Sequence, residues 1–329
     1  MIDLIIERAQ QVLSVPETLI SHIPYIPEYV KEALITTVYF VPVLYFLYYL
    51  IELLERFFLK NIGLFIKLVK RLGPIWGALT GIVPECGYAV IGSVFYARKM
   101  ITRGTLLAFL ISSSDDALPF LFMDLSKAIY IIPILVIKLV LAVVVAFVVD
   151  LLFVFKRELT EDINAINIDL NEPGCCDHKM CTIENPPYWW THPVIHTFNM
   201  FMFTFLSLVL INCVITKGYG SVEATAANML IDTPYQVILG AVFGLIPNCV
   251  ISIVFALLFV KGLISFPTLL AGLITSSGIA LMTLAKHNKS HKNDNAFITF
   301  ILFVVAVATG LAVYYNMGIL DNIYSYIFQ

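Results

Sequence analysis

Two short stretches of this sequence place cation-binding side chains inside apolar surroundings. Glu85 and Cys86 occur in "PECG", and Asn248 and Cys249 occur in "PNCV". Proline removes a backbone donor and interrupts a helix, so that neighbouring carbonyl oxygens can face a cavity. Carboxylate, amide and carbonyl oxygens and thiolates are all ligands of metal cations. We therefore expect a cation site at these breaks; the alternative for the cysteines is a packed kink in which they act as small apolar residues.

A second pair of stretches carries serines and acids. The first reads "SSSDDALP" and its counterpart reads "SSGIALM". The residues expected at the site are Ser113, Ser114, Asp115 and Asp116 in the first stretch, and Ser276 and Ser277 in the second. Adjacent residues on a helix point about 100° apart, so both acids face one site only if the helix unwinds there. Gly278 in the counterpart predicts unwound backbone instead of a charge.

Lys138 lies near the middle of "AIYIIPILVIKLVLAVVVAFVVD". A lysine this deep in an apolar segment cannot easily extend its amine to the membrane surface. We expect it to pair with Asp115, Asp116 or Glu85; the alternative is that it binds an anionic substrate together with helix N-termini. Asp150, at the end of the same segment, is expected to be an ordinary interfacial charge.

The polar stretch "GCCDHKMC" combines thiols with an imidazole, which are ligands suited to zinc, copper(I) or iron. Its candidate ligands are Cys175, Cys176, His178 and Cys181. The spacing differs from the C-x2-C of structural zinc sites, so reduced, solvated thiols are an equal alternative.

The composition indicates which kind of secondary structure holds these residues in place. Hydrophobic residues make up 60% of the 329 residues, charged residues 13%, and the mean hydropathy is +0.89. These values predict an all-α integral membrane protein. The expected spanning segments are 33–54, 104–124, 128–154, 192–216, 267–285 and 296–317. A net charge of −3 does not indicate a nucleic-acid-binding surface.

The two halves of the chain are related by a repeat. Residues 81–119 align with residues 244–282 without a gap, with 14 of 39 positions identical, including matched proline, cysteine and Ser-Ser. If residues 73–97 and 236–260 form re-entrant hairpins, 14 lysines and arginines lie on one side of the membrane and five on the other. This distribution obeys the positive-inside rule. Three crossings per half then predict two inverted repeats, with both termini outside.

The expected organisation has four parts. Residues 1–31 form an amphipathic N-terminal segment, 32–155 the first transmembrane repeat, 156–190 a cytoplasmic loop that contains the cysteines, and 191–329 the second repeat. Each repeat is expected to hold three spanning helices and one broken, re-entrant hairpin, followed by a helix broken at Ser-Ser.

The motifs resemble those of the ten-helix heavy-metal exporter family, whose members are also described as manganese transporters or arsenic-efflux-like permeases. The resemblance is carried by "VPVLYFLYYLIELLER", "PECGYAV", "FYARKMITRGTLLAFLISSSDDALP", "HPVIHTFNMFMFTFLSLVLIN" and "KGLISFPTLLAGLITSSGIAL". It implies efflux of a metal or metalloid. The chain departs from the family's pattern at Gly278 and Ile279, where acids are usual, and at Val250, where glycine is usual.

We therefore expect a plasma-membrane exporter of a divalent transition metal, manganese or another heavy metal, with protons as the candidate coupling ion. It is expected to need no cofactor and to catalyse no reaction; its partners are the lipid bilayer, the transported metal and a second copy of the chain in a homo-oligomer. A permease for anionic, organic-acid or arsenical substrates, and a membrane metal sensor without transport, are the alternatives. A di-aspartyl protease is disfavoured, because the second copy has no acids at the corresponding positions.

Overall fold

The computed structural model describes residues 26–60, 62–83, 86–113, 117–152, 191–219, 224 and 233–316, and every element among them is helical. The helices are α2 (Glu28–Lys60), α3 (Ile62–Gly81), α4 (Cys86–Ala97), α5 (Arg103–Ser112), α6 (Ala117–Leu121), α7 (Leu125–Ala128), α8 (Ile131–Leu152), α9 (Thr191–Cys213), η2 (Val214–Tyr219), α11 (Pro234–Gly244), α12 (Cys249–Val260), α13 (Phe266–Thr275), α14 (Ala280–His287), η3 (Lys289–His291) and α15 (Lys292–Tyr315). The helices divide between two compact units, residues 1–53 with 187–228 and residues 54–186 with 229–329.

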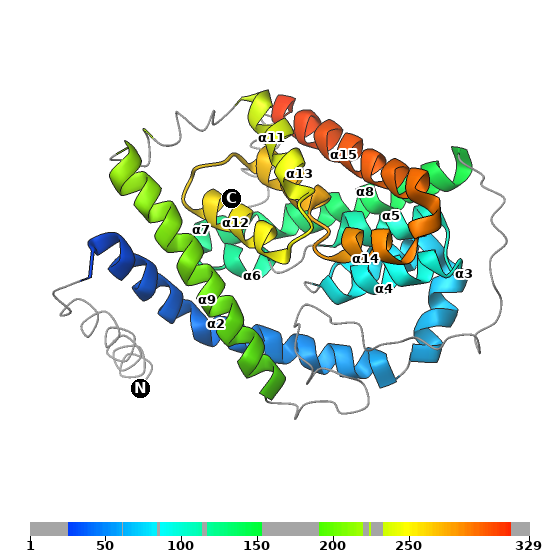
Figure 1. Ribbon diagram of the computed structural model, residues 1–329, viewed down its shortest axis with the longest axis horizontal. Helices are drawn as coiled ribbons and strands as arrows, with labels where there is room; N and C mark the ends of the chain where they lie inside the picture. The colour runs from blue at the N-terminus through cyan, green and yellow to red at the C-terminus, as the bar shows by residue number, and fades with distance from the viewer. Residues whose placement is uncertain are drawn as a thin grey trace, which may run out of the picture. The chain divides into compact units, whose positions relative to one another are not determined.

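The first unit pairs α2 with α9, which cross in Figure 1. Near the start of α2 and the end of α9, the Asn212 amide donates to the Tyr29 carbonyl oxygen at 3.4 Å. Further along α2, the ring centroid of Tyr48 lies 4.3 Å from that of His196, near the start of α9. Since the start of each helix lies near the end of the other, α2 and α9 run antiparallel.

The second unit repeats one packing pattern twice. Helix α5 packs against α3, α4 and α8, and α13 packs in the same way against α11, α12 and α15. Figure 1 shows α11 and α13 beside α15. The copies also contact each other in a matched way, α14 on α4 and α6 on α12. Helices α4 and α12 begin 163 residues apart, as do α6 and α14, which is the offset of the sequence repeat.

Glycines let these helices approach closely at equivalent positions. A Cβ atom at Gly81 would lie 2.0 Å from the hydroxyl oxygen of Ser112, and a Cβ at Gly244 would lie 2.1 Å from the hydroxyl oxygen of Thr275. Both members of each pair are related by the same offset of 163. A side chain at either glycine would therefore displace its neighbours: the Ser112 hydroxyl in the first copy, and the Thr275 hydroxyl together with the Gly272 backbone oxygen, at 2.4 Å, in the second.

A glycine and a phenylalanine have exchanged places between the copies. In the first copy a Cβ at Gly92 would lie 2.9 Å from the ring of Phe109, and in the second a Cβ at Gly272 would lie 2.8 Å from the ring of Phe255. Phe255 is equivalent to Gly92, and Gly272 is equivalent to Phe109. The same space is filled by a ring from opposite helices in the two copies.

Five of the six expected spans are supported by helical segments long and apolar enough to cross a membrane, namely 28–50, 131–152, 193–217, 266–287 and 292–315. The sixth, 104–124, is interrupted at Ser-Ser as expected, because α5 ends at Ser112 and α6 is a separate helix of five residues that begins at Ala117. Helix α2 begins at Glu28, within the predicted N-terminal segment 1–31, and the backbone amides of Val30 and Lys31 bond to the Pro27 carbonyl.

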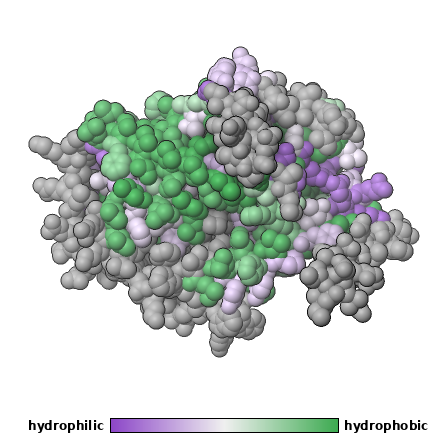
Figure 2. All heavy atoms as spheres, turned by 180° about the vertical axis from the view of Figure 1, so that it is seen from behind, coloured by the Kyte–Doolittle hydropathy of each residue, from purple (hydrophilic) through white to green (hydrophobic). Residues whose placement is uncertain are grey.

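Apolar side chains cover much of the described surface, as the green area in Figure 2 shows. Helix α8 illustrates the pattern. Its exposed residues include Ile132, Val136, Val140, Val144, Phe147, Val148, Leu151 and Leu152. Such a surface is stable in lipid and would aggregate in water, which agrees with a membrane protein.

Candidate functional site

Both motif cysteines are the first residues of twelve-residue helices. Cys86 begins α4 and Cys249 begins α12. The Asn248 side chain caps α12, because its Oδ1 atom accepts from the Val250 amide at 3.0 Å. Asn248 is exposed, and its carbonyl-type oxygen has a second lone pair for a ligand. Glu85 lies outside the described residues.

The serine motifs end two buried helices. The last helical residue of α5 is Ser112, with Ser113 as its C-cap, and α13 ends at Thr275, with Ser276 as its C-cap. In the second copy Gly278 has a φ of 53°, so the predicted unwinding at this glycine is confirmed. The helix resumes at Ala280.

Buried hydroxyls flank these breaks. Ser113, Ser276 and Ser277 are each at most 2% exposed. Within the described part of the chain, the Ser277 hydroxyl has no hydrogen-bond partner. A buried polar group normally requires a partner, so this hydroxyl is available to a ligand. Ser114, Asp115 and Asp116 lie outside the described residues.

Lys138 is fully buried and joins the two copies. Its ammonium group donates to the backbone carbonyl oxygen of Ser113, at the end of α5, and to that of Leu273, in the last turn of α13, at 2.8 Å. The acids expected to pair with it are not among the described residues, so that pairing stays a prediction. The bonds to two helix ends were not anticipated.

A polar cluster joins the start of α5 to the start of α15. The Arg103 guanidinium lies 2.6 Å from the carboxylate of Asp294, and the Tyr96 hydroxyl donates to the same carboxylate. Arg103 also donates to the Tyr96 hydroxyl at 3.3 Å and lies over the Phe297 ring. Charge-assisted hydrogen bonds among Arg103, Asp294 and Tyr96, and the cation–π contact of Arg103 with Phe297, thus link the first copy to the second.

An aromatic cluster occupies the equivalent place at the start of α13, where second-copy residues contact a first-copy residue. Phe259 and Phe266 are the counterparts of Tyr96 and Arg103 at the offset of 163. The Tyr130 ring lies 5.4 Å from Phe259 and 5.2 Å from Phe266, between centroids. The two copies therefore use different chemistry for the same contact, an ion pair in one and edge-to-face and tilted aromatic rings in the other.

The starts of α5 and α13 are held by different side chains. Asp150 accepts from the Gly104 amide at 2.8 Å and from the Thr102 hydroxyl at 2.6 Å, so the expectation of an ordinary interfacial charge is wrong for this residue. In the second copy, the Gln236 amide oxygen accepts from the amide and the hydroxyl of Ser265. Each contact satisfies donors that a helix start leaves without partners.

No three His, Cys, Asp or Glu side chains come together as a metal site within the described ranges, 26–60, 62–83, 86–113, 117–152, 191–219, 224 and 233–316. The expected first-copy acids and the loop ligands Cys175, Cys176, His178 and Cys181 fall outside those ranges. The predicted ligand sets therefore stay predictions, supported by the helix ends that flank them.

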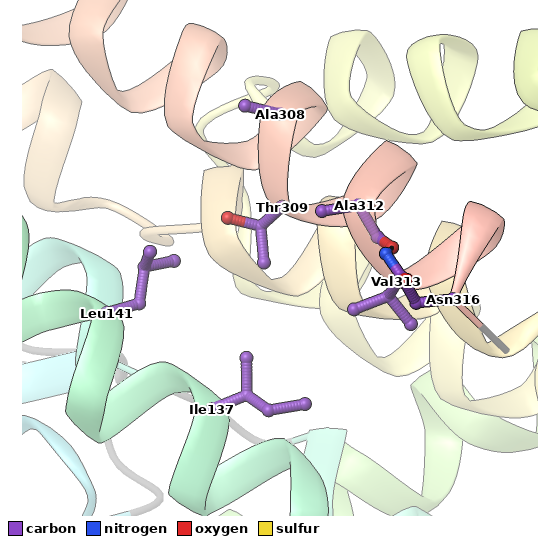
Figure 3. Close-up of a pocket in the computed structure, with 7 residues that line it drawn as sticks. All are labelled: Ile137, Leu141, Ala308, Thr309, Ala312, Val313 and Asn316. Carbon is purple, nitrogen blue, oxygen red and sulfur yellow. Dashed lines mark hydrogen bonds between the residues drawn. The ribbon is translucent and has the colours of Figure 1, made fainter. Parts of the chain in front are cut away.

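An apolar groove of about 640 Å³ lies between α8 and α15. Figure 3 shows Ile137 and Leu141 of α8 facing the α15 side chains across it. Thr309 and Asn316 supply its polar atoms, and the Asn316 amide donates to the Ala312 carbonyl at 2.7 Å. The described residues that line the groove include no charged or thiol side chain, so they offer no preferred ligand for a transition metal.

Sequence reasoning missed several residues that hold the site in place. Leu273 contributes only a backbone carbonyl, and Gln236 is a single amide in an apolar helix. The repeat alignment contained a usable signal for the polar cluster, because Arg103 and Tyr96 stand opposite two phenylalanines. An unmatched charge within a repeat indicates a partner elsewhere in the fold.

Comparisons with known proteins agree with this arrangement. A protein-family model described as "Putative, 10TM heavy-metal exporter" matches residues 23–230. Comparison with curated proteins gave no match, and comparison with solved structures gave none. The matched range contains Glu85, Asp115 and Lys138, and ends before the second-copy motifs. Since the match covers more than half of the chain, this multi-pass membrane protein belongs to the heavy-metal exporter family that it describes.

Proposed function

We propose that the chain is a secondary transporter that exports a divalent transition metal, manganese or another heavy metal, through a site between two inverted repeats. Membership of the exporter family supports metal transport in general. The observation that carries the proposal further is the meeting of α5 and α13 at one buried amine, at the point where the first copy continues into its two aspartates.

The contacts of α15 support an antiparallel arrangement of α5 and α13. Arg103, at the start of α5, pairs with Asp294, near the start of α15. The Pro267 carbonyl, at the start of α13, lies 3.1 Å from a Cβ built at Gly310, late in α15. Sixteen residues of helix (310 minus 294) span roughly 24 Å. The two helices thus start at opposite ends of α15 and end near the same lysine, as inverted half-helices do.

The antiparallel pair α2 and α9 in the other unit supports the same symmetry. These are the first helices of the two proposed repeats. Their contacts at Tyr29–Asn212 and Tyr48–His196 show that they run in opposite directions. A parallel duplication would bring the equivalent ends of these helices together instead. An inverted duplication is the simplest explanation for both units.

Helix lengths support the re-entrant hairpins. Helices α4 and α12 have 12 residues each, and α11 has 11. At 1.5 Å per residue they are roughly 16–18 Å long, little more than half of the roughly 30 Å bilayer core. Cys249 follows the first helix of such a pair, α11 and α12. In the first copy α3 is kinked at Gly73, which has a φ of 40°, so that only its last part, residues 74–81, forms the short helix before Cys86.

The first copy supplies the charge of the proposed metal site. We assign Glu85, Cys86, Asp115 and Asp116 as its ligands, and the second copy adds Asn248 and Cys249. Ser113, Ser114, Ser276 and Ser277 support the site with hydroxyl and backbone oxygens, and the unpartnered Ser277 hydroxyl favours a ligand there. Acidic oxygens with few thiols suit manganese better than a purely soft metal. Carboxylates can hold either a cation or a proton, so protons are the proposed coupling ion.

Transport by the purified protein in liposomes tests the proposal. A panel of Mn²⁺, Zn²⁺, Co²⁺, Cd²⁺ and arsenite is offered with and without a pH gradient, and we expect uptake of at least one divalent cation that the gradient accelerates. Glu85→Gln and Asp115→Asn are expected to abolish it, whereas Glu28→Gln, at an exposed position in the first turn of α2, should transport normally. Transport of arsenite alone, or full activity of both acid variants, would refute the metal assignment.

A further inference from the structure

The buried face of α8 carries a lysine side chain, whereas the buried face of α15 carries no charged side chain. These faces include Ile134, Lys138, Ala142 and Ala146 on α8, and Ile298, Leu302, Ala306 and Gly310 on α15. The four positions match one to one at a spacing of 164, one residue more than the offset of the motif repeat, so on the buried face Leu302 takes the place of Lys138. Both side chains are fully buried. The lysine is therefore a feature of one copy only.

The ammonium group of Lys138 is placed where a bound cation would be stable. The last carbonyl groups of a helix have no partners within the helix and carry its negative partial charge. Lys138 donates to one such carbonyl at the end of α5, that of Ser113, and to another in the last turn of α13, that of Leu273. It thereby compensates two converging helix ends, one from each copy.

Free cations use the same kind of ligand in transporters. Unwound carbonyls and the C-terminal ends of half-helices coordinate Na⁺ in inverted-repeat folds. Both α5 and α13 end in buried serines, Ser113 and Ser276, and carry no charged side chain at these ends among the described residues. Backbone carbonyl oxygens are hard ligands, which suit a monovalent cation better than a soft transition metal.

We propose that Lys138 is a built-in cation, whose ammonium group fills a monovalent-cation site formed by the C-terminal carbonyls of α5 and α13. The protein then needs no free Na⁺ or K⁺ at this position. Any effect of Lys138 on metal export rests on the proposed function. The prediction that Na⁺ or K⁺ can replace the missing ammonium group does not, because it concerns only these two helix ends.

Thermal unfolding of purified variants in matched salts tests this prediction. Lys138→Ala leaves space and two unsatisfied helix ends, so we expect its midpoint to rise by several degrees, saturably, in NaCl or KCl relative to choline chloride. The wild-type protein should show no difference between these salts. Leu302→Ala opens a comparable space on α15 without the helix ends, and it should respond to none of them.

Lys138→Ser is the second variant, because its hydroxyl keeps one donor while leaving room for an ion. An equal midpoint of both Lys138 variants in NaCl, KCl and choline chloride would overturn the proposal. An equal salt response of Leu302→Ala would overturn it as well. Failure of both Lys138 variants to fold in every salt counts against it too, because Na⁺ or K⁺ should replace the missing ammonium.

Liposome measurements separate this proposal from the metal-export function. If the chain exports a metal, the wild-type rate should not depend on Na⁺ or K⁺, and Lys138→Ala should export only when one of them is present. If no metal is transported by any form, the unfolding result still decides whether the lysine replaces a cation. Salt-dependent unfolding with no metal transport would support the cation site and refute the exporter.

Discussion

The Lys138 ammonium group lies 2.8 Å from the backbone carbonyl oxygen of Leu273, although these residues belong to opposite halves of the sequence. The same amine reaches Ser113 in its own half. One side chain thus fixes the ends of two equivalent helices with respect to each other. A charge buried in this way is costly unless it is compensated, and its two carbonyl contacts support the proposal that the site lies between these helix ends.

The close helix contacts predict a difference between two glycine substitutions. Gly81→Ala places its Cβ 2.0 Å from the Ser112 hydroxyl oxygen, whereas Gly244→Ala also meets the Gly272 backbone oxygen at 2.4 Å. We expect each substitution to lower the free energy of unfolding by about 1–3 kcal/mol, with the larger loss for Gly244→Ala. Thermal unfolding in detergent measures both.

Second substitutions test the cause. Ser112→Ala removes the clashing oxygen and should recover part of the stability of Gly81→Ala. Thr275→Ala should recover little in Gly244→Ala, because the backbone oxygen of Gly272 remains. Equal recovery in both pairs would mean that the side-chain oxygens, and not the backbone approach, decide the packing.

The exchanged glycine and phenylalanine predict a compensated double mutant. Phe255→Gly leaves a cavity beside Gly272 and should cost about 3–5 kcal/mol, whereas Gly272→Phe overfills the same space. The double mutant recreates the arrangement of Gly92 and Phe109 in the first copy. We expect a favourable coupling of about 1–3 kcal/mol in a double-mutant cycle. Additive losses would contradict the structural equivalence of the two copies.

The polar cluster predicts a charge-specific loss of stability. Asp294→Asn leaves the Arg103 guanidinium without its anionic partner, and both side chains are largely buried, at 11% and 15% exposure. We expect a loss of about 1–3 kcal/mol in thermal unfolding. Tyr96→Phe, which copies Phe259 of the other cluster, should cost less. The exposed Lys289→Gln is the control, and an unfolding midpoint of Asp294→Asn equal to that of the control would show that the ion pair is dispensable.

The proposed orientation predicts which thiols can be labelled. Residues 156–190 are expected in the cytoplasm, so Cys175, Cys176 and Cys181 should react with a membrane-impermeant maleimide only after the cells are permeabilised. Lys217→Cys, at an exposed position expected outside, should be labelled in intact cells. The reverse pattern would invert the topology and with it the direction of transport.

The sequence by itself determined the class of protein and its internal repeat. Composition requires a bilayer, because a surface this apolar is not stable in water. The matched prolines, cysteines and serines predicted where helices begin and end, and Cys86, Cys249, Ser276 and Gly278 lie at such positions in the structure. These features are local, since proline and glycine act on their own backbone.

Only the tertiary structure decided what the buried polar groups contact. The Ser113 carbonyl bound by Lys138, the Thr102 hydroxyl bound by Asp150 and the Asp294 carboxylate bound by Arg103 lie 25, 48 and 191 residues away from these side chains in the sequence. Helical periodicity specifies the face on which a side chain lies, but not the helix that packs on that face or whether it presents a carbonyl, a carboxylate or a ring. Lys138 could therefore be predicted as buried and functional, while its place between two helix ends followed from the packing of the two copies.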